Sequence, residues 1–353
     1  MNAPFRLYGA ELSPYSVKVR SYLRFKGLQF EWLERNAARQ EEFARYAKIP
    51  LIPILVDADE SVWQDSTPMI EALERMSPEP SIIPEDRAVA FIAALLEDYA
   101  DEWLNKAMFH YRWTYPEDQD SAVARLVEKM FDGAPAPEGV EAAAKARMEG
   151  RLHYVGSTPE NAPVIEGSFA YLLGALESVL QAQPYLLGGR PSIADFGFYG
   201  QFAQLLSDPT AGAMIRAQAP SIVAWVARME APRVEGPFAT LTALKESLGA
   251  IMRQEVADAY LAWAAANANA VADDHARVTV EIAGVSFSQK PQRYAAKALA
   301  ELKRKRAESA GEEALAALLS ETGCDRVLLA APTRADEAGP EEEDGAASDR
   351  DDE

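Results

Sequence analysis

The hydrophobic positions of the first 80 residues alternate between the spacing of strands and the spacing of helices. Strands are predicted at 5–8, 29–33, 52–56 and 61–63, and helices at 15–26, 40–47 and 67–76. A helix separates the first two strands, so they can pair in parallel, whereas the short link at 57–60 favours a hairpin for the last two. The order β-α-β-α-β-β-α is typical of a thioredoxin-like α/β domain.

From residue 84 to about 250 the hydrophobic positions recur only at helical spacing. Helices are predicted at 85–113, 118–131, 140–154, 164–183, 220–230 and 240–268. A further helix begins at Ser192-Ile193-Ala194-Asp195, where the serine and the acidic residue three positions later form a variant of the capping box. An all-helical domain therefore follows the first domain.

Beyond residue 250 the pattern changes again. Residues 277–282 and 285–289 alternate in hydrophobicity about Ala283-Gly284, which predicts a β-hairpin, and helices are predicted at 291–308 and 312–320. We expect four parts: a thioredoxin-like domain at 1–80, an all-helical domain at 84–250, a small α+β extension at 251–333 and a disordered acidic tail at 334–353.

The charge of the chain is strongly negative and unevenly distributed. The net charge is −20, which argues against a nucleic-acid partner because phosphate binding requires a basic surface. Residues 335–353 carry ten acidic side chains against Arg350 alone, whereas residues 290–306 carry seven Lys or Arg against Glu301. This basic stretch is either a solvated helix face or a docking surface for the tail or for an acidic partner.

The composition also predicts a cytoplasmic protein without a metal. No uninterrupted apolar stretch reaches the roughly 18 residues of a membrane span, and the N-terminus does not resemble a signal peptide. The single cysteine, Cys324, fits a reducing compartment, and we expect it to be a buried, non-catalytic side chain. His110, His153 and His275 are too scattered to predict a metal site.

Three separated segments of the first domain carry the candidate chemistry. Ser13-Pro14-Tyr15-Ser16 lies at a strand-to-helix junction, where free N–H groups and the helix dipole stabilise an anion such as a thiolate. Ile52-Pro53 opens the third strand, a place where proline often adopts the cis form. Gln64-Asp65-Ser66 begins a helix whose free amides can hold a carboxylate. In a thioredoxin-like fold these segments meet along one edge.

The combination resembles the cytosolic glutathione transferase superfamily over about residues 4–250. Ser13-Pro14-Tyr15 is similar to the active-site motif of its serine-type classes, and Ile52-Pro53 to its Val-Pro dipeptide with a cis proline. Asp65-Ser66 is similar to its Glu-Ser pair, and 192–195 to the Ser-X-Ala-Asp element of its helical domain. The order and spacing of the four motifs carry the resemblance together.

The resemblance implies roles for these residues. Ser13 would donate a hydrogen bond to the glutathione sulfur, and the backbone of Ile52 before Pro53 would pair with the cysteinyl unit. Asp65 and Ser66 would hold the γ-glutamyl end, and Gln64 beside them is a further candidate glutathione-binding residue. Glutathione would be the co-substrate, with no metal. Because serine cannot form a mixed disulfide, conjugation or peroxide reduction fits better than disulfide exchange.

The resemblance also implies a pocket for the second substrate and a homodimer. Tyr15, His110 and Trp113 are the candidate lining of a pocket for a hydrophobic electrophile. One departure concerns Leu51, which stands where the family often has a lysine for the glycyl carboxylate, while Lys48 lies nearby. Members of the family are mostly homodimers across the first domain and the first long helix.

Alternatives remain at two levels. Ser13 is also a residue that caps helices in any protein, and Ser16 and Tyr8 are rival hydroxyl donors. At the level of function, the leading expectation is a glutathione transferase with a role in detoxification. The alternative is a non-catalytic adaptor that keeps the fold for interaction, as in proteins that resemble metaxin or failed-axon proteins.

Overall fold

The computed structural model describes residues 4–330. Its first domain contains a four-stranded mixed sheet of β1 (Phe5–Gly9), β2 (Phe30–Glu34), β3 (Ile54–Val56) and β4 (Val62–Gln64). The order is β2-β1-β3-β4, in which β1 and β2 are parallel and the other pairs antiparallel. The predicted thioredoxin-like fold class is confirmed. The predicted tail at 334–353 lies outside the described residues.

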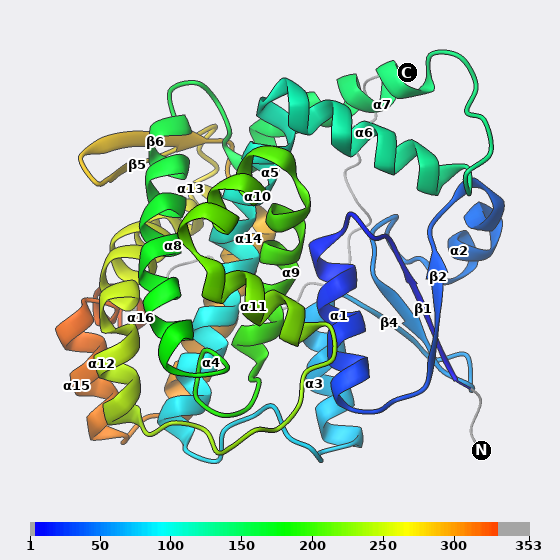
Figure 1. Ribbon diagram of the computed structural model, residues 1–353. Helices are drawn as coiled ribbons and strands as arrows, with labels where there is room; N and C mark the ends of the chain where they lie inside the picture. Colours follow the sequence, from blue (N-terminus) through cyan, green and yellow to red (C-terminus); the bar gives the residue numbers. More distant parts are fainter. Residues whose placement is uncertain (1–3, 331–353) are drawn as a thin grey trace.

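Helices cover both faces of this sheet (Figure 1). Helices α1 (Pro14–Phe25) and α3 (Ser66–Met76) lie between the sheet and the helical domain, and α2 (Gln40–Tyr46), which follows the short 3₁₀ turn η1 (Ala37–Arg39), lies on the other face. Because alternate strand residues point to opposite faces, Leu7 joins the main core while Tyr8 packs with Phe43 of α2. The sheet is therefore buried on both sides.

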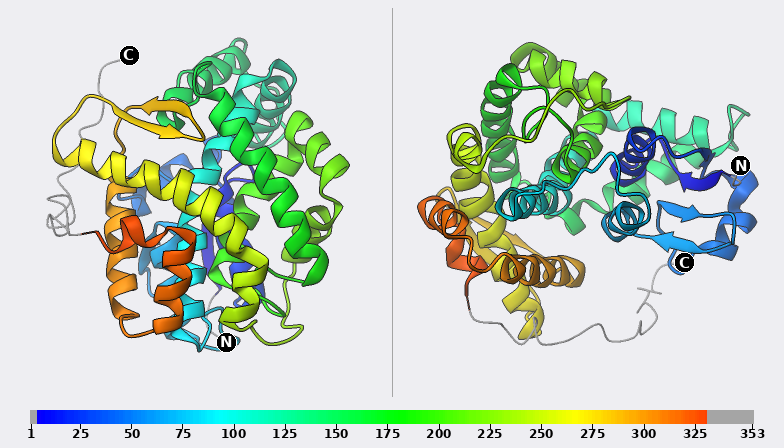
Figure 2. Two further views of the ribbon diagram at one scale, coloured as in Figure 1. Left: turned by 90° about the vertical axis from the view of Figure 1, so that its left-hand side faces the viewer. Right: turned by 90° about the horizontal axis from the view of Figure 1, so that it is seen from below.

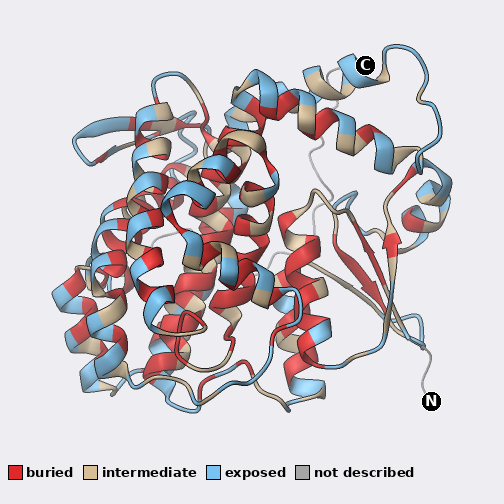
Figure 3. Cartoon of the chain, viewed as in Figure 1, coloured by how far each residue is buried: buried red, intermediate tan, exposed pale blue. Residues whose placement is uncertain are grey.

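The second domain is all-helical, as predicted. Its elements are α4 (Arg87–Tyr99), η2 (Ala100–Leu104), α5 (Asn105–Thr114), α6 (Pro116–Met130), α7 (Val140–Glu149), η3 (Leu152–Val155), α8 (Ala162–Ala182), α9 (Ile193–Ser207), α10 (Pro209–Gln218), α11 (Pro220–Met229) and α12 (Leu241–Ile251). The predicted helix 85–113 is one continuous helical run, but its middle turn, η2, is π-helical. Buried residues concentrate in the central helices (Figure 3).

Helix α8 is the one described helix that is long and apolar enough to cross a membrane. Half of its apolar window is buried inside the fold, where Phe169, Leu172 and Leu176 belong to the main core. Its hydrophobicity is therefore accounted for by packing. The cytoplasmic location stays a prediction.

The extension continues the last helix of the second domain. Helix α12 passes directly into the π-helical η4 (Met252–Leu261) and α13 (Ala262–Ala272), so the predicted limit at residue 250 falls within a helical run. The predicted hairpin follows as β5 (Val278–Ile282) and β6 (Val285–Gln289), and then α14 (Arg293–Glu308), α15 (Glu313–Thr322) and α16 (Asp325–Leu328). The domain limits themselves stay predictions.

The extension folds back against the rest of the chain. Helix α14 packs on α4, and the Lys305 ammonium forms an ion pair at 2.6 Å with Glu71 of α3. In Figure 2 the orange α14 stands beside the cyan α4. A segment far along the sequence thus reaches the thioredoxin-like domain.

Candidate active site

A cavity of about 600 Å³ lies where the first domain, the helical domain and the extension meet. The first domain contributes residues 48–49, 51–53, 64–66 and 68 together with Tyr15. Residues 101–102 and 105–106 of the central helix form another wall, with Tyr154 and Val155 near them. The extension supplies Trp263, Gln292, Tyr294 and Ala295. A cavity of this size can hold a tripeptide and part of a second molecule.

The strand-edge segment has the expected geometry. The peptide bond between Ile52 and Pro53 is cis, and both residues line the cavity. The side chain of Gln64 donates hydrogen bonds from Nε2 to the carbonyl oxygens of Ile49 at 2.7 Å and Leu51 at 2.8 Å. Since its amide also accepts from the Ile49 N–H, Gln64 holds the loop that precedes Pro53.

The N-terminus of α3 forms the adjacent edge of the cavity. Ser66 is the first residue of the helix, and Asp65 before it has φ 80°, in the left-handed region that non-glycine residues seldom adopt. The Asp65 carboxylate accepts a hydrogen bond at 2.7 Å from the hydroxyl of Tyr294, on α14. The extension thus contacts the group to which the family resemblance gives the γ-glutamyl end.

The structure separates the two serines of the opening motif. Ser13 caps α1, and its half-buried Oγ accepts a hydrogen bond from the Ser16 N–H at 3.2 Å. Ser16 is fully buried, and its Oγ has no hydrogen-bond partner among residues 4–330. Neither serine belongs to the cavity lining, but Ser13 is the one with exposed surface. The rival donor Tyr8 is fully buried and bonds to Glu42.

Tyr15 connects the motif to the central helix. Its hydroxyl donates to the Asp101 carbonyl oxygen at 3.1 Å and accepts from Asn105 Nδ2 at 3.3 Å. Burial, with the nearby carboxylates of Asp101 and Glu102, raises the pKa of Tyr15 well above its usual value. Tyr15 therefore lines the cavity as a neutral phenol whose hydroxyl is already engaged.

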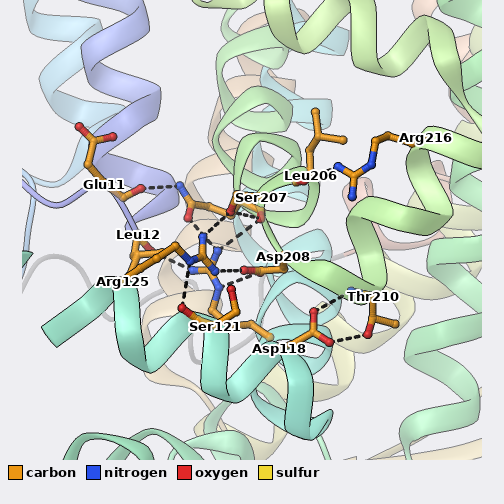
Figure 4. Close-up of polar contacts among 12 residues, drawn as sticks. Glu11, Leu12, Asp118, Ser121, Arg125, Leu206, Ser207, Asp208, Thr210 and Arg216 are labelled. Atoms are coloured by element: carbon orange, nitrogen blue, oxygen red, sulfur yellow. Dashed lines mark hydrogen bonds and ion pairs between the residues drawn. The ribbon is translucent and has the colours of Figure 1, made fainter. Parts of the chain in front are cut away.

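Buried polar groups of the helical domain hold the loop before Ser13 (Figure 4). Arg112 donates to the Leu12 carbonyl oxygen at 3.0 Å, and Gln204 Nε2 donates to the Glu11 carbonyl oxygen at 2.9 Å. Arg112 is itself fixed by Asp208 at 2.8 Å, a carboxylate that Arg125 also contacts. The carbonyl oxygens of Glu11 and Leu12 thus each accept a hydrogen bond from a buried side chain of the helical domain.

A second buried cluster joins α1, α3 and the central helix. The Lys18 ammonium contacts Glu97 at 2.5 Å, Asp101 at 2.6 Å and the Thr67 hydroxyl at 3.1 Å. Burial raises the pKa of Asp101 to about 7, against the lowering effect of Lys18. The cluster fixes the N-termini of α1 and α3 relative to each other.

His110 and Trp113 lie away from the cavity lining. His110 is buried, and its two ring nitrogens contact the Ser157 hydroxyl at 2.8 Å and Glu166 at 3.1 Å. Burial lowers the pKa of His110. Trp113 packs in a separate apolar cluster with Val123 and Val127 of α6. Of the three predicted pocket residues, the structure brings only Tyr15 to the cavity.

Lys48 and Leu51 both line the cavity and both are exposed. Leu51 leaves its position without a charge, whereas the Lys48 ammonium lies on the same loop, three residues earlier. Lys48 is thus the cation of the first domain that borders the cavity.

Sequence reasoning did not identify Lys106 or the contribution of the extension. Lys106 lines the cavity and lies four residues before His110, so the two residues share a face of the predicted helix. A lysine on an apolar helix face was the available signal. Nothing in the sequence places Trp263 or Tyr294 near residue 65, because that contact spans more than 190 residues.

Cys324 is buried, and burial raises the pKa of its thiol to about 11. Among residues 4–330, no group of three His, Cys, Asp or Glu side chains is placed to hold a metal ion.

Comparison with known proteins gives a consistent family. The N-terminal domain of glutathione S-transferases matches residues 7–81, and their C-terminal domain matches residues 160–228. The isoprene-epoxide–glutathione S-transferase of Rhodococcus sp. (strain AD45) is 24% identical over 204 residues, which are 56% of this chain and 82% of the relative. Glutathione S-transferase 3 of Zea mays is 28% identical over 202 residues, 54% of this chain and 86% of the relative.

Among solved structures, a glutathione S-transferase of Methylobacterium radiotolerans in complex with glutathione sulfonate aligns with 22% sequence identity and a TM-score of 0.43. The alignment covers 67% of this chain and 97% of that chain. The two family matches both end before residue 229, so the extension lies outside them.

Proposed function

The chain belongs to the cytosolic glutathione transferase superfamily, and on this premise we propose that it binds glutathione in the cavity and activates its thiol toward an electrophile. The observation that carries the proposal is the convergence of two predicted segments, Ile52-Pro53 and Asp65-Ser66, on one cavity beside the N-terminus of α1. No single motif would support it alone.

Activation of the thiol is assigned to Ser13. A free thiol has a pKa of about 8.5, so only a few per cent is ionised at neutral pH. Since the Ser13 oxygen accepts its hydrogen bond from the Ser16 N–H, the hydroxyl proton is left to donate to a sulfur anion. The N-terminal amides of α1 add a favourable field. Both effects lower the pKa of a thiol held there.

The two ends of the tripeptide are assigned to the other edges of the cavity. The free amides at the start of α3 and the Ser66 hydroxyl suit the γ-glutamyl carboxylate, and Asp65 suits the γ-glutamyl amine. Lys48 takes the glycyl carboxylate in place of the residue at 51. Gln64 acts indirectly, by holding the loop at 49–51.

The reaction is conjugation to an electrophile or reduction of a peroxide, as a serine-type site supports. A cytoplasmic location and a role in detoxification remain part of the proposal. The alternative is a non-catalytic adaptor, and one contact favours it: the Tyr294 hydroxyl already occupies the Asp65 carboxylate that a glutathione amine would use.

Isothermal titration of the full-length protein with glutathione tests the proposal. We expect binding at micromolar to low millimolar glutathione. We also expect Ser13→Ala to lower kcat/KM toward an electrophile by about 100-fold with a smaller change in affinity, because the variant lacks a hydrogen-bond donor that acts mainly in the transition state. Ser178→Ala, at an exposed hydroxyl on α8 that bonds the Gly174 carbonyl oxygen, is the matched control. No heat of binding at millimolar glutathione would favour the adaptor.

A further inference from the structure

Lys106 is an almost fully buried lysine in the wall of the cavity. Its side chain comes from α5 and is 3% exposed. The ammonium nitrogen lies 3.9 Å from the ring centroid of Trp263, 5.6 Å from that of Trp103 and 5.9 Å from that of Phe287. Three aromatic faces therefore surround the ammonium group, and two of them belong to the extension.

The ammonium group has few polar partners. Within the described part of the chain, it donates one hydrogen bond, to Gln289 Oε1 at 3.1 Å, and forms no ion pair with a carboxylate. An ammonium has three donors, so two remain for another acceptor. A buried charge without a counter-ion is costly, and burial lowers the pKa of Lys106 to about 7.

Among the described residues, no acidic side chain that shares the cavity forms an ion pair with Lys106. Asp101 is paired with Lys18 at 2.6 Å, and Asp65 accepts the hydrogen bond of Tyr294. Glu102, one turn before Lys106, has a pKa raised well above its usual value by burial and by the neighbouring carboxylates Asp98 and Asp101. Within residues 4–330, Lys106 therefore keeps one hydrogen-bond acceptor, Gln289, and pairs with no carboxylate.

The position of Lys106 suits the second substrate. It follows Asn105, whose amide bonds the hydroxyl of Tyr15, so the wall that holds Lys106 contacts the helix that Ser13 caps. On the opposite side the extension closes the wall with Trp263. A molecule that reacts with a thiol near Ser13 would extend along this wall.

We propose that Lys106 binds and protonates the oxygen of the electrophile, and that the second substrate is an electrophile whose oxygen gains negative charge as the thiolate attacks. This inference rests on the proposed glutathione site. Two classes share this chemistry, α,β-unsaturated carbonyl compounds and epoxides. Lys106 is a catalytic residue in this account because it touches the reacting molecule.

The step balances in both cases. With an unsaturated carbonyl compound, the sulfur bonds to the β-carbon and the π electrons move to the carbonyl oxygen. Lys106 then donates its proton to the oxygen of this enolate, and tautomerisation of the enol places a proton on the α-carbon. With an epoxide, sulfur bonds to a ring carbon, the C–O bond breaks and the alkoxide takes the proton of Lys106. In both reactions the glutathione thiol releases one proton to solvent, and the Lys106 amine takes up one proton from solvent to become charged again.

The first test measures the rates of full-length wild type and Lys106→Met with three electrophiles: cinnamaldehyde, styrene oxide and benzyl chloride. Benzyl chloride is the comparison substrate, because its reaction places the negative charge on the departing chloride and not on an oxygen. We expect Lys106→Met to lower kcat by about 100-fold with cinnamaldehyde, styrene oxide or both, the size of a lost general acid, and to change kcat with benzyl chloride little. Lys106→Gln keeps a donor and should recover part of the loss. If the rate falls with only one of the two oxygen-containing substrates, that result shows whether the site takes unsaturated carbonyl compounds or epoxides.

The matched control is Lys245→Met, which removes a half-exposed lysine of α12 that pairs with Glu321. Methionine is similar in length to lysine and leaves no buried charge without a counter-ion, so we expect Lys106→Met to melt at or above the wild-type temperature. An equal loss with all three electrophiles, or none with any of them, would overturn the inference.

A second measurement needs no glutathione. Acetophenone and ethylbenzene have similar shapes and differ in one carbonyl oxygen, and their binding should quench the fluorescence of Trp263 beside Lys106. We expect wild type to bind acetophenone about tenfold more tightly and Lys106→Met to show no preference, as for one hydrogen bond to a charged group. Equal binding by wild type would refute the Lys106 site even if glutathione binds. A preference without glutathione binding would instead refute the proposed function.

Discussion

At the scale of single residues, the structure gives Ser13 and its rival donor Ser16 different surroundings. The motif predicted a hydroxyl at a helix start, but Ser13 and Ser16 both fit, because capping preferences tolerate a serine at either position. Only packing distinguishes them: Ser16 faces Gly9, and a side chain at Gly9 would come within 2.9 Å of the Ser16 Cβ. Close contact of this kind has no local sequence signal.

Ser16→Ala is therefore expected to leave activity unchanged and to stabilise the protein. Its hydroxyl is fully buried, and no group in the described chain bonds it, so removing it relieves an unpaired polar atom, a gain of about 1 kcal/mol. Urea denaturation of wild type and variant measures the difference. Loss of activity in Ser16→Ala, with Ser13→Ala active, would reverse the two assignments.

Lys106 shows the limit of sequence reasoning at this scale. The hydrophobic spacing predicts an amphipathic helix at 85–113, but no motif in that helix singles out Lys106. The chemistry depends instead on Trp263 and Gln289, which are more than 150 residues away in the chain and come from elements whose docking the pattern does not specify.

At the scale of elements, local signals predicted most of what was found. The hairpin of β5 and β6 turns at Ala283 and Gly284, whose φ angles of 51° and 77° are those of the tight turn that such a pair favours. Helix α10 was missed, because it begins at Pro209 only two residues after α9 ends and has few apolar positions of its own. The π-helical turn at 100–104 was also missed, since hydrophobic spacing does not distinguish it from an α-helix.

One close approach between elements positions the opening motif. A Cβ on Gly200 of α9 would lie 2.6 Å from the Pro14 carbonyl oxygen, so α9 can contact the start of α1 only because this residue is glycine. The contact brings the helical domain up against the residue that follows Ser13.

Gly200→Ala should therefore displace the start of α1. We expect a loss of about 2 kcal/mol in unfolding free energy, typical of overpacking, and at least a tenfold loss of kcat/KM. Gly174→Ala on α8, where a Cβ meets nothing within 4 Å, is the control and should instead stabilise by up to about 1 kcal/mol. Thermal melts and steady-state rates measure both. If the two variants behave alike, α9 does not position Ser13.

At the scale of the whole molecule, the extension changes the surface that the first two domains present. Helix α14 packs along α4, and the hydroxyl of Tyr260 bonds Asp98 of the same helix. After its exposed first residue, α4 is buried along its whole length except at Ala90, Ala94 and Asp98, which are partly exposed. The sequence predicted that the extension exists and which elements it has, but not where it docks, because that contact depends on the finished surfaces of both parts.

This packing argues against the dimer interface that the family resemblance implies. The first long helix and the thioredoxin-like domain are the surfaces that the family resemblance assigns to the dimer, and α14 now covers α4 and pairs with α3 through Lys305 and Glu71. We therefore predict a monomer. Light scattering should give a mass near 38.6 kDa at micromolar concentration, and twice that mass would show that another face forms a dimer.

The central claim is that Ser13 and the N-terminus of α1 hold glutathione as a thiolate, and the ionisation of the bound thiol tests it most directly. The ultraviolet absorbance of the thiolate, followed against pH for glutathione bound to wild type and to Ser13→Ala, gives the pKa of the sulfur in each. We predict a pKa below about 7.5 in wild type, compared with about 8.5 for a free thiol, and a rise of at least about one unit in the variant. A bound thiol that titrates like free glutathione in both proteins would contradict the account.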